Sequence, residues 1–454
     1  MSSSRTTGPA HRRRRRSHGS EQRPDPLGAL GGRVVTRVDA PGVVPPRRTG
    51  RSGRARRYVL PVVLVLVVAL ISVGAGLQWS RRVPAPVFRP AMADSVTLPG
   101  TSPSLPWPTA GAAALAMEGV GSLGHVGSTA PAPIASITKV MTAYVVLKDH
   151  PLAAGATGPL IPVTAADVAV YQLGLATQQS VLAVANGETL TEMQALEGLL
   201  IPSGNNIASL LADWDAGSSA AFVAKMNAAA QALGLSSTHF NDASGLDSGS
   251  VSTPADLIQL GQAAMSIPAF AQIVGLGEAT LPVAGLVYNF DYDLGRDGII
   301  GIKTGTDAAA GGCFLFEAQS KVDGRKVTLV GAVLGQQSSS PITTVLAEAE
   351  ALAKAAFADM GSLPVLPPDH LVGRVVTAWG TSVAVTALHA PSIVGWPGLT
   401  VPARLEVGPL PARVAAGTRI GTLSIDLDGD NMAVAVRATH AVSGPSVIWR
   451  LTRR

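Results

Sequence analysis

Three short motifs, each present once and in a fixed order, constrain this chain more than any other feature. They are Ser136-Ile137-Thr138-Lys139, Ser203-Gly204-Asn205 and Lys303-Thr304-Gly305. The chain has seven lysines, of which one follows a serine by three residues and one precedes Thr-Gly; one of its seven asparagines follows a serine by two. Each motif carries polar groups that a catalytic site uses, so the fold is expected to bring the three together.

The first motif pairs a nucleophile with a base. Ser136 and Lys139 are three residues apart at the start of a predicted helix, which places them on one face. A serine hydroxyl is a weak nucleophile unless a base lies beside it. A lysine with a pKa of ~10.4 becomes a base near neutral pH only after roughly 4 kcal/mol of burial and like-charge repulsion. Lys303 is the candidate second cation, and the helix N-terminus favours negative charge near Ser136.

The other two motifs supply polar walls for such a site. Ser203 and Asn205 are predicted on a loop between two helices, where a hydroxyl and an amide can bridge Lys139 and a substrate peptide bond. Lys303-Thr304-Gly305 is predicted to end a strand, whose edge can pair with an extended peptide. Lys303 and Thr304 would face a substrate carboxylate, and Gly305 permits close approach. The N–H groups of Ser136 and Thr306 are a candidate oxyanion pair.

The charge distribution divides the chain. Residues 1–57 carry fifteen arginines against three acidic residues, a net charge of +12, while the rest carries twenty basic against twenty-seven acidic residues, or −7. Tyr58–Leu77 follows as an uncharged stretch that spans roughly 30 Å as a helix, the thickness of a bilayer core. The positive-inside rule predicts a cytoplasmic tail and an extracytoplasmic main part, anchored by a single pass. A cleaved signal peptide is the alternative, and binding of nucleic acid by the tail is not expected.

The remaining sequence predicts two folded parts. After a basic tail expected to be disordered (1–57) and the transmembrane helix (58–77), a proline-rich linker is predicted over 78–108. An α/β (α+β) domain with an antiparallel sheet flanked by helices is predicted over 109–362, because helical spacing alternates there with strand-like runs. Alternating apolar residues separated by Gly and Pro predict a small all-β domain over 363–454. The single cysteine, Cys313, is expected to be buried, and no residue cluster has metal-ligand spacing.

The flanks of the motifs resemble the D-alanyl-D-alanine carboxypeptidases, low-molecular-mass penicillin-binding proteins of serine peptidase family S11. The likeness covers about residues 109–360. It is carried by Pro133–Tyr144, Gly198–Asn206, Phe222–Asn227, Phe240–Leu246 and Gly301–Thr306.

The resemblance implies a β-lactamase/D,D-peptidase-like catalytic domain and a β-sandwich-like domain at the C-terminus. Ser136 would be the acylated nucleophile and Lys139 its base, with Ser203 and Asn205 as the second active-site element. Lys303, Thr304, Gly305 and Thr306 would line the substrate strand. The implied substrate is the D-Ala-D-Ala end of a peptidoglycan stem peptide, β-lactams would be inhibitors, and no cofactor is implied.

Other functions remain open on the sequence alone. They are a β-lactamase, a D,D-endopeptidase, and a catalytically weak or inactive homologue that binds cell-wall peptide or a partner. Three features depart from the family pattern: Asn206 stands where Asp is frequent, Tyr288–Asp293 is a poor version of an Asn-Thr-Asn-type stretch, and the loop Gln336–Ser340 lacks an arginine.

Overall fold

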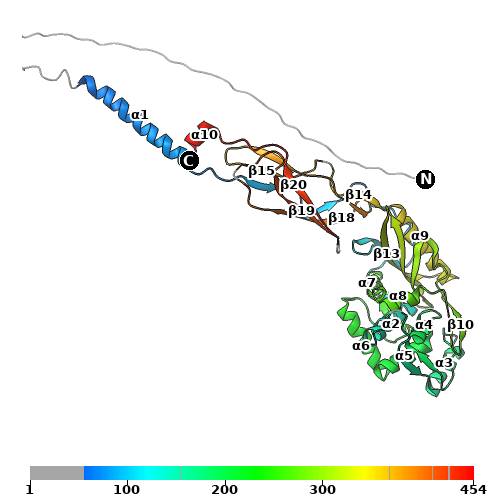
Figure 1. The fold of residues 1–454 in the computed structure, drawn as a ribbon. Helices are drawn as coiled ribbons and strands as arrows, with labels where there is room; N and C mark the ends of the chain where they lie inside the picture. The colour runs from blue at the N-terminus through cyan, green and yellow to red at the C-terminus, as the bar shows by residue number, and fades with distance from the viewer. Residues whose placement is uncertain (1–55, 154, 368, 412, 428–429) are drawn as a thin grey trace, which may run out of the picture. The chain divides into compact units, whose positions relative to one another are not determined.

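The computed structural model describes residues 56–153, 155–367, 369–411, 413–427 and 430–454. The predicted disordered tail therefore lies outside the described residues, apart from Arg56 and Arg57. The chain divides into two compact units, 1–77 and 78–454, of which Figure 1 shows the secondary structure. Helix α1 (Arg56–Ser80) contains a segment, Tyr58–Ser80, with a mean hydropathy of 2.8. By length and composition it is able to cross a membrane, as an anchor or as a signal sequence.

A five-stranded antiparallel sheet forms the framework of the second unit. Its order is β11-β12-β13-β3-β4, so β11 and β4 are the edge strands. The strands are β3 (Ala112–Met117), β4 (Gly121–Val126), β11 (Ile299–Asp307), β12 (Gly311–Val322) and β13 (Arg325–Gln336). The sheet is antiparallel, as predicted: β11, β12 and β13 form a meander of three consecutive strands, and β3 pairs with β13.

Both faces of the central strands β12 and β13 are largely buried. Phe314 and Phe316 on β12 pack in one apolar cluster with α9 (Pro341–Ala358), whereas Cys313 and Leu315 belong to a second cluster with the other helices. Successive strand residues point to opposite faces, so a strand covered on both sides is continuously apolar. This explains the uninterrupted run of apolar residues around Cys313. Burial raises the pKa of the Cys313 thiol to about 12, which leaves it a small buried apolar group at neutral pH.

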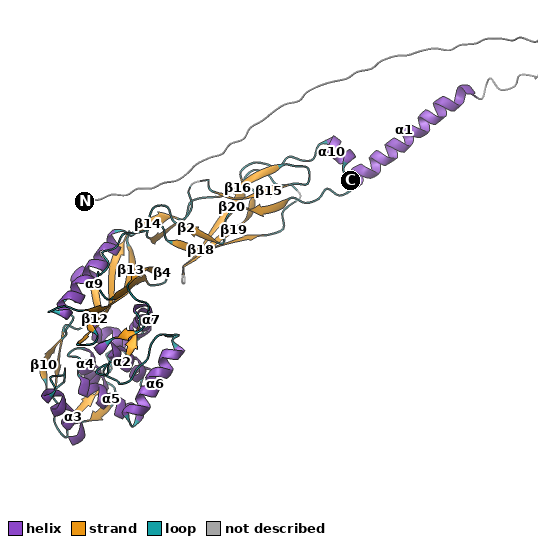
Figure 2. Ribbon diagram, turned by 180° about the vertical axis from the view of Figure 1, so that it is seen from behind, coloured by secondary structure: helices purple, strands orange, loops and turns teal. Residues whose placement is uncertain are grey.

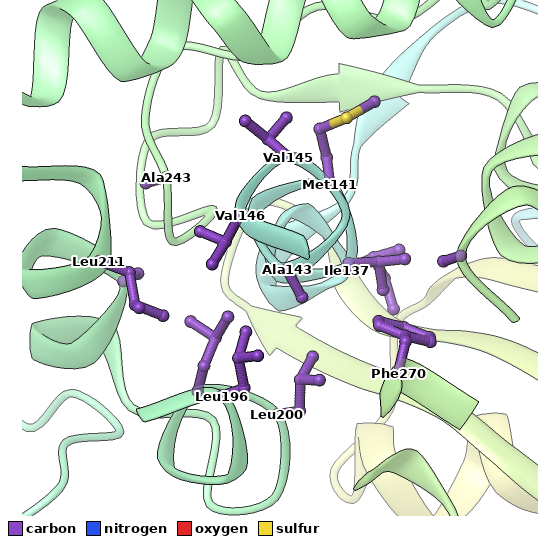
Figure 3. Packing of buried hydrophobic residues seen from close by; sticks show 14 of the residues in the cluster. Ile137, Met141, Ala143, Val145, Val146, Leu196, Leu200, Leu211, Ala243 and Phe270 are labelled. Carbon is purple, nitrogen blue, oxygen red and sulfur yellow. The ribbon is translucent and has the colours of Figure 1, made fainter. Parts of the chain in front are cut away.

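Seven helices surround or flank the second cluster. They are α2 (Thr138–Asp149), α3 (Ala165–Ala176), α4 (Glu192–Leu200), α5 (Asn205–Ala216), α6 (Ser219–Ala232), α7 (Pro254–Met265) and α8 (Pro268–Val274). Helix α2 lies at the centre, and Figure 3 shows Leu196 and Leu200 of α4, Leu211 of α5 and Phe270 of α8 around it. Burying each such side chain stabilises the fold by about 1.5–3 kcal/mol. A helix packed on nearly every side also carries Lys139 into the interior.

The C-terminal region consists of β-strands, as predicted, apart from the short helix α10 (Val447–Thr452), and Figure 2 shows these elements. Its main sheet has the order β1-β15-β16-β20-β19-β18-β2, in which β1 (Val87–Pro90) and β2 (Ser95–Thr97) precede the five-stranded sheet in the chain. The strands of this region that follow α9 in the chain are β14 (Gly361–Pro364), β15 (Leu371–Val376), β16 (Ser382–Ala387), β17 (Ser392–Gly395), β18 (Thr400–Val407), β19 (Arg419–Leu427) and β20 (Asp430–Ala438).

The predicted linker over 78–108 differs from the structure at two places. β1 (Val87–Pro90) pairs with β15, and β2 (Ser95–Thr97) pairs with β18, so this segment supplies both outer strands of the C-terminal sheet. The prediction rested on the proline content, but proline is tolerated at the edge of a sheet. Pairing with strands almost 300 residues away leaves no local signal in the sequence.

Candidate active site

Ser136 and Lys139 lie where the chain enters helix α2. Ser136 is in a short 3-10 turn (Ala135–Ile137), and Lys139 is in the first turn of α2. The Lys139 Nζ lies 2.8 Å from Ser136 Oγ, within the reach that a nucleophile and its base require. Ala135, just before the nucleophile, has a φ of 45°, a left-handed conformation that non-glycine residues adopt mainly at constrained sites.

The Lys139 side chain is buried and fully hydrogen-bonded. Besides Ser136, its Nζ donates to Asn205 Oδ1 at 2.7 Å and to the carbonyl oxygen of Ser244 at 2.8 Å. Burial holds the pKa of Lys139 well below its usual range, the positive charge of Lys303 lowers it further, and Asp242 acts in the opposite direction. Burial and a second lysine are the two causes expected from the sequence. A lysine with a lowered pKa spends more time as the neutral amine that can accept a proton.

The second motif contributes one direct contact and one unpaired hydroxyl. Asn205 begins α5 and holds Lys139 through Oδ1, while its Nδ2 donates to Gln179 Oε1 at 3.0 Å. Ser203 lies two residues earlier with a φ of 62°. Its Oγ is buried and has no hydrogen-bond partner within the described residues. A buried hydroxyl without a partner lowers the stability of the folded protein by about 1–3 kcal/mol. An unpaired buried group of this kind is typical of a position adapted to a reaction or a ligand rather than to stability.

The third motif lies inside β11 rather than at its end, because the strand continues to Asp307. The sequence prediction placed the motif at the end of a strand, with Gly305 permitting close approach of the substrate. The structure gives it another role: a Cβ built at Gly305 would lie 2.8 Å from the backbone nitrogen of Ser136. Only glycine allows the strand to pack this closely on the nucleophile. Lys303 and Thr304 are buried beside it, and Thr306 is exposed on the same edge strand.

Lys303 has an electrostatic counterpart in Asp291. Its Nζ donates to the carbonyl oxygen of Thr304 at 3.0 Å. Burial lowers the pKa of Lys303 to about 7, and the charge of Asp291 opposes that shift. Burial also raises the pKa of Asp291 to about 7. The stretch Tyr288–Asp293, which departs from the family pattern, therefore contributes the Asp291 carboxylate to the surroundings of Lys303. The net charge of Asp291 and Lys303 together changes around neutral pH.

A loop that the sequence did not single out as functional completes the surroundings of Lys139. It is the segment 242–246, whose Ser244 carbonyl accepts one of the three hydrogen bonds of the lysine. The resemblance covered this segment, but a backbone acceptor leaves no side-chain signature. Only the stretch Asp242-Ala243-Ser244-Gly245, with its short polar residues and glycine, indicated a tight turn.

Hydrogen bonds of the Asn206 side chain explain why an asparagine, rather than the frequent aspartate, stands at this position. Its Oδ1 accepts from the backbone nitrogen of Leu182 at 2.8 Å, and its Nδ2 donates to the carbonyl oxygen of Leu182 at 2.9 Å. This pair of bonds ties the start of α5 to the segment before β7 (Thr189–Thr191). An aspartate could accept the first bond but could not donate the second when ionised.

Asn206→Asp is therefore expected to destabilise the protein by about 1–3 kcal/mol at neutral pH, because one buried carbonyl loses its donor. The deficit should shrink at low pH, since a protonated carboxyl regains a donor. Urea unfolding at two pH values measures both effects, with the exposed Asn186→Asp as the matched control. Equal stability of Asn206→Asp and the wild type at neutral pH would contradict this role.

Comparisons with known proteins agree with the geometry. Residues 123–338 match the family model Peptidase S11, D-alanyl-D-alanine carboxypeptidase. The D-alanyl-D-alanine carboxypeptidase of Streptomyces sp. strain K15 is 34% identical over 220 residues, which cover 45% of this chain and 72% of that protein. This chain belongs to peptidase family S11. D-alanyl-D-alanine carboxypeptidase DacB2 of Mycobacterium tuberculosis is 39% identical over 185 residues, which cover 39% of this chain and 59% of the relative.

Two solved structures are similar to this chain in fold. The Streptomyces K15 DD-transpeptidase matches with a TM-score of 0.50 at 29% identity, over 56% of this chain and 99% of that one. Penicillin-binding protein 5 from Haemophilus influenzae is 22% identical with a TM-score of 0.53, and the match covers 76% of this chain and all of that one. The match to penicillin-binding protein 5 covers a larger part of this chain than the match to the K15 enzyme does. The catalytic domain predicted from the sequence thus has the D,D-peptidase fold.

Proposed function

We propose that the chain is a serine D,D-carboxypeptidase that removes the terminal D-Ala from peptidoglycan stem pentapeptides through an acyl-enzyme on Ser136. The contact between Lys139 Nζ and Ser136 Oγ, with the pKa of the lysine lowered by burial, carries this proposal. Family membership supports it, since the relatives named above are D-alanyl-D-alanine carboxypeptidases.

In the proposed acylation step, neutral Lys139 takes the proton of Ser136 as the hydroxyl oxygen attacks the carbonyl carbon between the two D-Ala residues. The bond to the terminal D-Ala breaks, and its nitrogen must receive a proton as it leaves. Ser203 is the candidate for passing on that proton, because its hydroxyl is buried, lies two residues before Asn205 in the chain and has no hydrogen-bond partner within the described residues. Water then hydrolyses the ester on Ser136, which restores the free enzyme.

The proposed substrate lies along β11, a free edge of the five-stranded sheet. An extended peptide can add to such an edge through backbone hydrogen bonds. The N–H groups of Ser136 and Thr306 are proposed to stabilise the oxyanion. Lys303, with the hydroxyl groups of Thr304 and Thr306, is the proposed site for the terminal carboxylate.

Incubation with a stem pentapeptide ending in D-Ala-D-Ala tests this proposal. Mass spectrometry should show a tetrapeptide and one equivalent of free D-Ala. Adding an amine acceptor separates hydrolysis from transfer, because a transferase would give a product heavier than the tetrapeptide by the acceptor minus water. An intact pentapeptide after prolonged incubation with folded protein would contradict the proposal and favour a homologue that binds without turnover.

We further propose that α1 is an uncleaved anchor that holds the catalytic domain outside the cytoplasmic membrane. The charge difference across Tyr58–Leu77 and the uninterrupted apolar surface of the helix support this. The full chain should stay in the membrane fraction after alkaline carbonate washing, and protease added to spheroplasts should digest the catalytic domain. Recovery of a shortened soluble form that begins after residue 80 would favour a cleaved signal sequence.

A further inference from the structure

One carboxylate organises the loop that supplies the third acceptor of Lys139. Asp242 Oδ2 accepts from the backbone nitrogens of Ser244 and Leu246 at 3.2 and 3.0 Å and from the Ser244 hydroxyl at 2.6 Å. Its Oδ1 accepts from the Gly245 nitrogen at 3.0 Å and the Ser250 hydroxyl at 2.8 Å. Five donors thus converge on a single carboxylate, and three of them are backbone groups of the loop 243–246.

The loop 243–246 also contacts the elements that carry the nucleophile and the base. Thr142 Oγ1 on α2 donates to the Ala243 carbonyl at 2.6 Å, one turn beyond Lys139, which itself donates to Ser244. On the other side, a Cβ built at Gly245 would lie 1.8 Å from the carbonyl oxygen of Ala135, the residue before Ser136. The loop is therefore packed against α2 and the turn of Ser136, and the Asp242 carboxylate accepts hydrogen bonds from its backbone.

We propose that Asp242 is a positioning residue for the acylation step: its carboxylate holds the loop 243–246 so that the Ser244 carbonyl faces Lys139. With that carbonyl and Asn205 accepting the two N–H groups of the neutral lysine, the lone pair is directed at Ser136. This inference rests on the proposed function, because it assigns a role in the reaction of that same site.

Asp242 also acts on Lys139 through its charge. Two charged groups shift the pKa of Lys139 from outside its own helix: Lys303 on β11 lowers it, and Asp242 raises it. Lys303 is itself influenced by Asp291. The other groups that contact Nζ, the Ser136 hydroxyl, the Asn205 amide and the Ser244 carbonyl, are neutral. Removing the charge of Asp242 therefore lowers the pKa of Lys139, whereas the loss of a loop contact remote from Lys139 would leave it unchanged.

The test is the rate of acylation by benzylpenicillin, followed by intact-protein mass from pH 5 to pH 9 on the full chain in detergent. Asp242→Asn removes the charge and turns one acceptor into a donor that faces the loop N–H groups. It is expected to slow acylation by about 10- to 100-fold, as small displacements of catalytic groups do. Its rate should nevertheless begin to rise at a lower pH than that of the wild type, because less of Lys139 is protonated.

Two further variants separate positioning from charge and from folding. Asp242→Glu keeps the charge but moves the carboxylate, so acylation should slow while its pH dependence stays like the wild type. Asp167→Asn is the matched control, because Asp167 also accepts from a backbone nitrogen and a hydroxyl, both of Thr164, in the cap of α3. It should leave both the rate and the pH dependence unchanged.

The outcomes discriminate the alternatives. A wild-type rate in Asp242→Asn, or a slower rate with an unmoved pH dependence, would overturn the proposal. If Asp242→Asn does not fold by circular dichroism, Asp242→Glu decides: slower acylation with wild-type pH dependence supports the proposal, and an unchanged rate overturns it. If the wild type forms no adduct and releases no D-Ala, the proposed function itself has failed, which is a separate result.

Discussion

Ser136→Ala is expected to abolish both D-Ala release and formation of a penicillin adduct. The only group lost is the hydroxyl oxygen that would form the ester, and Lys139 would remain held by Asn205 and Ser244. The fold should not change, since Ser136 is only half-buried and its side chain is replaced by a smaller one. Release of D-Ala from the pentapeptide and intact-protein mass after benzylpenicillin measure the two effects.

The exposed Ser219→Ala, at the start of α6, is the matched control and should behave like the wild type. An adduct or continuing D-Ala release in a Ser136→Ala variant of correct mass would place the nucleophile elsewhere. Ser203 would then be the next candidate, because its hydroxyl is buried and unpaired within the described residues.

Lys139→Met is expected to slow acylation by at least about 100-fold, since a positioned general base contributes about 10²–10⁴-fold. Methionine fills much of the same buried volume but cannot accept a proton from Ser136. The replacement leaves Asn205 Oδ1 and the Ser244 carbonyl without their donor, so some loss of stability is expected as well, about 1–3 kcal/mol for each group. Acylation rates and thermal unfolding are measured on the same preparation.

Lys148→Met, on the exposed face of the last turn of the same helix, controls for the loss of a lysine from α2. It should retain the wild-type rate. If folded Lys139→Met is acylated as fast as the wild type, another group is the base. Lys303 would be the first to consider, because burial also lowers its pKa, to about 7.

The sequence predicted the parts of this protein whose signals are local. The serine and lysine three residues apart and the alternating apolar runs over 363–454 are local patterns, and each indicates the secondary structure of its own segment. The sheet of β11, β12 and β13 was predictable because short turns join consecutive antiparallel strands. Burial of Lys139 was expected from the chemistry, and the fold provides it by surrounding α2 with other helices.

The remaining features depend on contacts between distant residues. β1 and β2 form strands because they pair with β15 and β18, which lie far away in the sequence. Gly305 continues its strand because it packs on Ser136, 169 residues earlier. The Ser244 carbonyl became visible as a partner of Lys139 only in three dimensions, since any residue carries a carbonyl. These positions share one property: the deciding partner is far away in the chain.

The most direct test of the central claim is the mass of the intact wild-type chain over time after addition of benzylpenicillin, followed by mapping of the labelled peptide. We expect one drug mass to be added, on the peptide that contains Ser136, and to be lost slowly. An unlabelled protein with the drug intact would contradict an active acylating serine. An unlabelled protein with the drug destroyed would contradict the carboxypeptidase proposal in favour of a β-lactamase.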